Sequence, residues 1–147
     1  MINRVILQGF VAEDPFVRST ERGMVARIRM ATVKYIPSGD ERLREVVEWH
    51  SVVFWGEQAK IVDEQIRAGM ALYIEGELQT RSWEDKSGVK HRTTDIVASQ
   101  LRLLDGIEGY RLPSSITPTI VERSVEAVKE SSKPFSAPAD DIDNLPF

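Results

Sequence analysis

The sequence predicts an all-β fold with one short helix, in the order three strands, one helix and two strands. Apolar and polar residues alternate with a period of two through most of residues 1–105, which is typical of strands with one buried face. Within residues 1–105, only residues 57–68 combine regular apolar spacing with the period of a helix; beyond them, residues 119–130 have some helical spacing, which leaves a short or partner-induced helix open there. One short helix cannot cover both faces of an open five-stranded sheet, whereas a closed barrel removes the exposed edges. We therefore expect a small five-stranded barrel.

Three strands are expected before the helix. The first spans residues 5–10 and ends before the Asp14-Pro15 pair, which interrupts regular structure. The second begins at Gly23, with apolar residues at its even-numbered positions and two arginines at odd-numbered ones. The third spans about 46–55 and is apolar on both faces. One face can fill a barrel, and the other needs another subunit, a ligand or another element of the same chain.

The helix is predicted over residues 57–68, directly after Gly56. Ala59, Val62 and Ile66 recur at a spacing that places them on one side of a helix. Gly69 follows the last helical residue and is placed to act as its C-cap. The helix should therefore bury one apolar stripe and end at Ala68.

Two strands follow the helix. The fourth runs from residue 72 toward Trp83, and the last spans residues 90–104. Between them, residues 85–88 read Asp-Lys-Ser-Gly, a sequence typical of a hairpin turn. Five strands with a helix between the third and the fourth is the order of the OB-fold, so the fold class predicted is a five-stranded OB-fold barrel.

Composition excludes several classes of function. The chain of 147 residues carries 19 Lys+Arg against 23 Asp+Glu, a formal net charge of −4, which argues against a simple basic protein that coats nucleic acid. It has no cysteine and two histidines, so cysteine chemistry is excluded and a His-rich metal centre is not expected. No catalytic motif and no P-loop occurs in it. We predict no catalytic residue, metal site or cofactor.

The charge is unevenly distributed along the chain. Residues 1–105 hold 15 Lys+Arg and 16 Asp+Glu, whereas residues 106–147 hold 4 and 7. Residues 106–139 are rich in Pro and Ser and poor in large apolar residues, so we expect a flexible linker there. Residues 140–147 form an acidic tip. No apolar run is long enough to span a bilayer, and the start lacks a signal-peptide pattern, which predicts a cytoplasmic protein without a membrane partner.

Aromatic rings and cations lie close together in the predicted strands. Trp49 and Trp55 share a face of the third strand, and Arg81 and Trp83 share a face of the fourth. The second strand carries a further group of this kind, namely Arg27, Arg29, Lys34 and Tyr35. Single-stranded nucleic acid needs π faces for its bases and cations for its phosphates. Periodicity alone leaves each Trp open between barrel core and ligand face, and the arginines open as a solvated strand face.

Seven short motifs follow one another along residues 1–105. They are Asn3-Arg4-Val5-Ile6-Leu7, Asp14-Pro15-Phe16-Val17-Arg18, Val25-Ala26 with Ala31-Thr32, Glu48-Trp49-His50-Ser51-Val52-Val53, Tyr73-Ile74-Glu75-Gly76, Thr80-Arg81-Ser82-Trp83, and Ser87-Gly88 with Thr93-Thr94. In this order the motifs resemble those of the bacterial single-stranded DNA-binding proteins. The resemblance covers nearly all of the predicted barrel.

The resemblance implies roles for individual residues. Bases would stack on Trp49, Trp55, Trp83 and Tyr35. Phosphates would be contacted by Arg4 and Arg81. Apart from the resemblance, their placement beside aromatic residues adds Arg27, Arg29 and Lys34 as candidate phosphate contacts. His50 resembles the histidine that family members place at a subunit interface. Glu57 and Ser82 stand where relatives often carry a basic residue, so we expect a weaker salt dependence of binding than is usual in the family.

The end of the chain matches the same family independently. Family members end in an acidic tip that closes with Pro-Phe, and the corresponding residues here are Asp140, Asp141, Asp143, Leu145, Pro146 and Phe147. A terminal ring and carboxylate can enter an apolar pocket of a partner while the aspartates meet a basic rim. The resemblance therefore implies that the tip recruits enzymes of replication, recombination and repair.

The resemblance as a whole implies a non-catalytic homotetramer that binds single-stranded DNA without reading its sequence. It would protect unwound DNA in the bacterial cytoplasm. Two other interpretations remain open at this point. One is a replication-restart accessory protein with an OB-fold, a class that generally lacks the acidic Pro-Phe tip. The other is a barrel that binds oligosaccharides or serves only in assembly.

Overall fold

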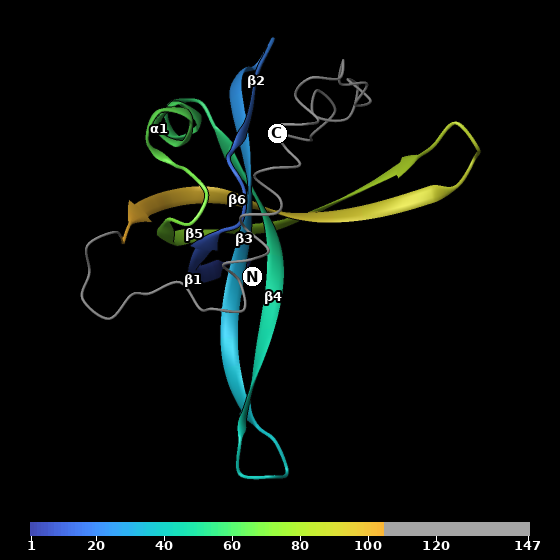
Figure 1. Cartoon of the computed structure of the whole chain (residues 1–147). Helices are drawn as coiled ribbons and strands as arrows, with labels where there is room; N and C mark the ends of the chain where they lie inside the picture. The colour runs from blue at the N-terminus through green and yellow to red at the C-terminus, as the bar shows by residue number, and fades with distance from the viewer. Residues whose placement is uncertain (105–147) are drawn as a thin grey trace, which may run out of the picture.

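A computed structural model of the chain describes residues 1–104 and shows six strands and one helix (Figure 1). The strands are β1 (Val5–Val11), β2 (Phe16–Thr20), β3 (Gly23–Pro37), β4 (Leu43–Trp55), β5 (Ala71–Glu84) and β6 (Lys90–Leu103), and the helix is α1 (Glu57–Gln65). The predicted linker over 106–139 and the predicted tip over 140–147 lie outside the described residues.

Five of the strands close into a barrel. Their order is β1-β5-β6-β4-β3, and β3 returns to β1 through the pairs Phe10–Ala31 and Val11–Met30. All pairings are antiparallel except that of β4 with β6. The sixth strand, β2, pairs only with β3 and lies outside the closed ring. This architecture confirms the predicted OB-fold barrel with one helix between its third and fourth barrel strands.

Two glycines allow the barrel strands to approach one another. A Cβ atom on Gly9 would lie 2.2 Å from the carbonyl oxygen of Ala31, where β1 and β3 close the ring. A Cβ atom on Gly76 would lie 2.3 Å from the carbonyl oxygen of Val97, beside the bulge between β5 and β6. Both contacts are far below van der Waals distance, so any side chain at either position would push the backbones apart.

The barrel core is formed by the residues that alternation predicts. Ala26, Ile28 and Met30, the even-numbered positions of β3, are fully buried. They pack with β4, β5 and β6, and with three residues of the helix and its C-cap, Ala59, Val62 and Ile66, which are also fully buried. Burial of these apolar side chains stabilises the barrel by about 25 cal/mol for each Å² removed from water.

Two details of the prediction were wrong. The strand β2 was not predicted, because the Asp14-Pro15 pair was interpreted as the start of irregular structure, whereas β2 begins directly after it. The helix ends at Gln65 rather than at residue 68, because Ile66 already has extended backbone angles and acts as the C-cap. Gly69 lies beyond the helix, where its amide donates to the carbonyl oxygen of Val11 at 2.8 Å.

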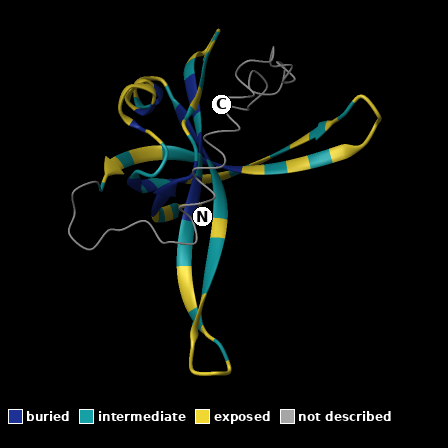
Figure 2. Ribbon diagram, in the orientation of Figure 1, coloured by how far each residue is buried: buried dark blue, intermediate teal, exposed yellow. Residues whose placement is uncertain are grey.

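Two long hairpins extend from the barrel in different directions (Figure 1). We call residues 29–51 the β3–β4 arm and residues 79–95 the β5–β6 arm. Buried residues are concentrated in the barrel, whereas both arms consist mainly of half-buried and exposed residues (Figure 2). Among residues 1–104 there is no helix with the length and apolar character needed to cross a membrane.

Candidate nucleic-acid interface

The outer face of β3 and β4 carries most of the predicted site residues. Residues directly opposite in an antiparallel pair point to the same side of the sheet. The outward pairs are Val25–Trp55, Arg27–Val53, Arg29–Ser51, Ala31–Trp49 and Tyr35–Glu45. The register therefore brings both tryptophans, both arginines and Tyr35 to one side of the strand pair.

The same face continues across β6 and β5. Val97 pairs with Val53 on one side and with Glu77 on the other, so the outward residues of four strands are contiguous. Farther along, the outward pairs of these two strands are Gln79–Asp95, Arg81–Thr93 and Trp83–His91. We call this four-stranded surface the outer face. It joins the bases of both arms.

Trp49 lies at the base of the β3–β4 arm and outside the barrel core. The half-buried indole packs against a separate apolar cluster that includes Phe10 and Ala31. The guanidinium carbon of Arg29 lies 4.9 Å from the centre of the indole ring, which is a cation–π contact. Part of the apolar outer side of β4 is therefore covered by other residues of the same chain.

Trp55 lines a hollow of about 590 Å³ at the junction of the helix with β5 and β6. The hollow is lined by Arg22, Trp55, Glu57, Gln58, Glu77, Val97 and Ala98. The lining combines an indole with two carboxylates, and Glu57 also contacts the ammonium group of Lys60 at 2.8 Å. A ring can therefore enter beside Trp55, whereas a phosphate would meet two carboxylates and the single guanidinium of Arg22 there.

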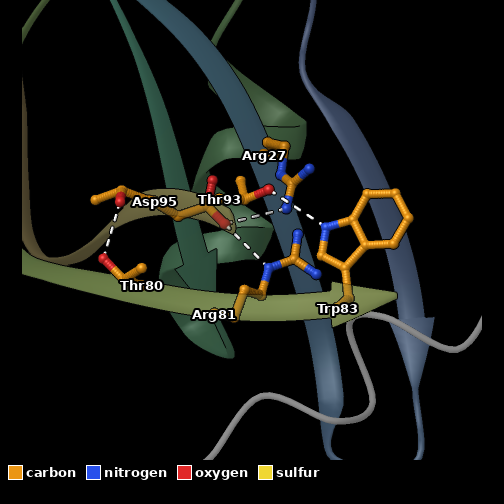
Figure 3. A network of polar contacts seen from close by, with 7 residues as sticks. Arg27, Thr80, Arg81, Trp83, Thr93 and Asp95 are labelled. Carbon is orange, nitrogen blue, oxygen red and sulfur yellow. Dashed lines mark hydrogen bonds and ion pairs between the residues drawn. The ribbon is translucent and has the colours of Figure 1, made fainter. Parts of the chain in front are cut away.

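Trp83 lies on the β5–β6 arm and stacks on His91. The ring centres are 4.4 Å apart with 22° between the planes, and the indole N–H donates to the hydroxyl of Thr93 at 3.5 Å (Figure 3). His91 in turn contacts Asp85 at 2.9 Å between Nε2 and Oδ2. The hydrogen bond to His91, and then one from the amide of Val89, lower the pKa of the Asp85 carboxyl.

A buried carboxylate connects two of the three arginines that the outer face carries, Arg27 and Arg81. Asp95 of β6 is only 3% exposed, and its Oδ2 lies 3.5 Å from a terminal nitrogen of Arg27 and 3.5 Å from Nε of Arg81 (Figure 3). Asp95 was not among the predicted site residues. Alternation could have assigned it to the outer side of its strand, but no local pattern indicates that two distant arginines converge on it.

Tyr35 and Lys34 are neighbours in sequence but lie on opposite sides of the β3–β4 arm. Tyr35 is 56% exposed and shares the side of Trp49. Lys34 pairs with Val46 and is exposed on the other side. The structure therefore does not bring Lys34 together with the stacking residues. Ser82 also points to the other side of its arm, where it pairs with Arg92.

Arg4 lies apart from the outer face, at the start of β1. Its guanidinium contacts the carboxylate of Glu75, which also accepts a hydrogen bond of 2.5 Å from the Tyr73 hydroxyl. The hydrogen bond from Tyr73, followed by that from Arg4, lowers the pKa of Glu75, and the same bond to Glu75 raises the pKa of Tyr73. A phosphate that contacts Arg4 would therefore lie beside the carboxylate of Glu75.

His50 lies on the opposite side of β4 from Trp49. A hydrogen bond of 2.8 Å joins its Nε2 to the hydroxyl of Thr32. Partial burial lowers the pKa of the imidazole, although the charge of Glu48 acts in the other direction. At neutral pH the ring is therefore uncharged and available for a close contact with a polar or apolar surface.

The fold and the outer face together define an OB-fold protein that carries aromatic rings and arginines on the outside of its barrel. The sequence profile described as "Single-strand binding protein family" matches residues 2–104. The chain belongs to this family, as its motifs indicated.

Similar proteins carry the corresponding name. The chain is 39% identical over 106 residues to a single-stranded DNA-binding protein of Xanthomonas axonopodis pv. citri, covering 71% of this chain and 59% of that protein. It is 34% identical over 158 aligned positions to the single-stranded DNA-binding protein 1 of Chlorobaculum tepidum, covering 99% of this chain and 98% of that protein. The chain thus spans about three fifths of the first relative and nearly all of the second.

Two solved structures show the same fold. A Plasmodium falciparum SSB in complex with single-stranded DNA superposes with a TM-score of 0.66 at 26% identity, covering 71% of this chain and 97% of that one. A deletion mutant of the single-stranded DNA-binding protein from Thermus aquaticus superposes with a TM-score of 0.64 at 27% identity, covering 76% and 54%.

Proposed function

We propose that this chain binds single-stranded DNA on its outer face without reading the base sequence, and so protects DNA during replication, recombination and repair. One observation carries the proposal: Trp49 with Arg29, and Trp83 with Arg81, lie on one continuous surface that spans four strands. Membership of the single-strand binding protein family supports it. We infer a binding role and no catalysis.

Binding on this surface would alternate stacking with charge neutralisation. Each base stacked on an indole contributes about 1–3 kcal/mol, and every base has a π face, so this term does not depend on sequence. Each phosphate neutralised by an arginine releases counterions. The proposed stacking residues are Trp49, Trp55, Trp83 and Tyr35, and the proposed phosphate contacts on the same face are Arg27, Arg29 and Arg81. Lys34 and Arg4 would be reached only by DNA that wraps beyond this face.

The proposal is tested by titrating the full chain with poly(dT) and recording tryptophan fluorescence. Stacking of thymine on the indoles should quench the emission strongly, and added salt should weaken binding because its cations compete with the arginines for the phosphates. Double-stranded DNA of the same length is the control, since its bases are not available to stack. Absence of quenching at low salt would contradict the proposal.

We further infer that the protein is a homotetramer in the bacterial cytoplasm, with His50 at a subunit interface. The uncharged, half-buried ring of His50 supports this assignment because it can be covered without burying a charge. Sedimentation of the full chain and of His50→Glu tests it. A charged side chain there should dissociate the assembly into dimers or monomers, whereas an unchanged tetramer would exclude His50 from the interface.

The acidic tip, residues 140–147, is proposed to recruit enzymes of replication, recombination and repair. Its composition supports this role, since it offers three aspartates, a penultimate proline and a terminal phenylalanine ring. Capture of such an enzyme by the full chain, but not by a chain lacking the tip, would support the assignment. Equal capture by both chains would contradict it.

A further inference from the structure

Asp95 is the most buried charged residue of the outer face, and it lies where a negative charge is least expected. Its carboxylate meets Arg27 of β3 and Arg81 of β5 at the same oxygen, Oδ2, at 3.5 Å each. The other oxygen, Oδ1, is buried and has no hydrogen-bond partner among the described residues. Burial of a carboxylate costs free energy that the contacts with its partners must offset.

Electrostatics alone would exclude a carboxylate from this position. The proposed ligand is a polyanion, so Asp95 repels it and reduces the local charge of the group from about +2 to about +1. The benefit has to come from geometry. Two guanidinium groups that converge from different strands repel each other, and a carboxylate between them offsets that repulsion and limits their freedom to rotate.

The orientation of Arg81 shows how this geometry serves binding. Its Nε faces Asp95, while its two terminal nitrogens are turned away from the carboxylate toward Trp83 (Figure 3). An arginine can contact an anchor through one nitrogen and a phosphate through others, because its donors are spread over a planar fork. A lysine has one nitrogen and lacks this planar spread of donors.

We propose that Asp95 is a positioning residue for single-stranded DNA binding, which holds Arg81 and Arg27 in place to contact the phosphates next to a base stacked on Trp83. This inference rests on the proposed function and deepens it. It gives a buried carboxylate a favourable role in DNA binding, a role that net charge alone would assign only to lysine and arginine. It also predicts that removal of a negative charge weakens the binding of a polyanion.

The first test is Asp95→Asn in the full chain, titrated with a dT oligomer at several salt concentrations. Positioning predicts that affinity falls about tenfold and that the salt slope becomes shallower by about 0.7 for each phosphate that is no longer neutralised on the single strand. Simple charge removal predicts the opposite, with tighter binding and a steeper slope. Tighter binding by Asp95→Asn would overturn the inference while leaving the proposed function intact.

A matched control separates local from global charge. Asp63→Asn removes one carboxylate from the exposed side of α1, so it changes the net charge equally. We expect its affinity and salt slope to equal those of the unmodified chain within about twofold, because the Debye length is about 8 Å at physiological salt. If Asp63→Asn weakens binding as much as Asp95→Asn, the effect of Asp95 is not local and the inference fails.

The second test does not depend on the stability of Asp95→Asn. Arg81→Lys keeps the charge but leaves a single nitrogen, which Asp95 should retain, so binding should weaken nearly as much as in Arg81→Gln. Arg92→Lys, on the other side of the same arm, is the control and should bind normally. Normal binding by Arg81→Lys would show that charge alone suffices and would overturn the positioning role. Failure of the unmodified chain to bind would instead contradict the proposed function.

Discussion

The two arms carry the same pair of side chains, a tryptophan and an arginine, but they support it in different ways. On the β3–β4 arm, Arg29 lies directly over Trp49, and the indole rests on an apolar cluster. On the β5–β6 arm, Trp83 stacks on His91, and Arg81 is held by a buried carboxylate. Packing supports one pair, and polar contacts support the other.

This difference shows that the two proposed stacking positions are held in place by different kinds of interaction. Apolar packing is non-directional and insensitive to salt, so the Trp49 platform also contributes to the stability of the fold. Polar contacts are directional and sensitive to salt, so the position of Trp83 depends on the contacts that Asp85, His91 and Asp95 make. Mutations, salt and pH should therefore affect the two arms differently.

The largest effect is expected from Trp49→Ala. Removal of a stacking platform should weaken the binding of a dT oligomer by about 1–3 kcal/mol. Because the indole also packs on the apolar cluster, its removal should lower the free energy of unfolding by about 1–2 kcal/mol. Trp83→Ala should weaken binding by a similar amount but change the free energy of unfolding by less than about 0.5 kcal/mol.

Fluorescence anisotropy with a labelled oligomer and urea unfolding measure these two quantities. Trp49→Phe and Trp83→Phe are the controls, since each keeps an aromatic face and should recover most of the affinity. If Trp83→Ala destabilises the fold more than Trp49→Ala, then the assignment of packing to one arm and polar support to the other is wrong.

A smaller effect is expected from Arg29→Gln. It removes the cation–π contact with Trp49, worth about 0.5–1 kcal/mol at a partly exposed site. It also removes one proposed phosphate contact, so the salt slope should become shallower by about 0.7. Arg44→Gln is the matched control, because Arg44 is exposed on the same arm but pairs with Ile36 on the opposite side. Equal effects of the two substitutions would show that only the charge of the arm matters.

The arms should also differ in their response to pH. His50, behind the β3–β4 arm, has a pKa lowered by burial from an ordinary value of 6.5. The His50 ring is therefore protonated less readily in the folded protein than in the unfolded chain. The contribution of the uncharged His50 ring to the free energy of unfolding is complete above pH 6.5 and decreases as the pH falls from there toward the lowered pKa.

Asp85, at the turn of the β5–β6 arm, should act at lower pH. Its pKa is lowered from an ordinary value of 3.8, chiefly by the hydrogen bond with His91. Its contribution is complete above 3.8 and is lost as the pH falls through the lowered pKa. The unfolding temperature, measured between about pH 3 and 8, tests both statements. Compared with the unmodified chain, His50→Gln should depend less on pH near pH 6, and Asp85→Asn should depend less on pH near pH 3. If both variants changed the same window, the two sites would not be independent.

The sequence was sufficient to predict those parts of the structure that depend on local periodicity. Alternation placed Trp49 and Trp55 on one face and the even-numbered residues of β3 in the core, and the structure confirms both. The predicted turn after β5 is also confirmed, with the amide of Asp85 donating to the carbonyl oxygen of Val89 at 2.9 Å. These features need only the period of a strand and the chemistry of a turn.

Features that depend on how distant strands meet could not be predicted in this way. Arg27 and Asp95 are 68 residues apart, and they meet because β6 lies beside β4 in a parallel pairing. Period alone says which side of a strand a residue occupies, but not which other strand comes next to it. Lys34 is a different case, because alternation already separates it from Tyr35, and only its proximity in sequence suggested a shared site.

The smallest effect on DNA binding is expected from deletion of residues 140–147. The three aspartates of this segment could compete with DNA for arginines on either arm, but physiological salt screens attraction between charges more than about 8 Å apart. We expect the affinity for a dT oligomer to stay the same or to rise by less than about threefold at physiological salt. Replacement of the three aspartates by asparagine is the matched control, since it keeps the length of the chain. Repeating the deletion in Trp49→Ala and in Trp83→Ala would show which arm the acidic segment competes for. A large decrease in affinity would instead mean that the segment contributes to the DNA interface itself.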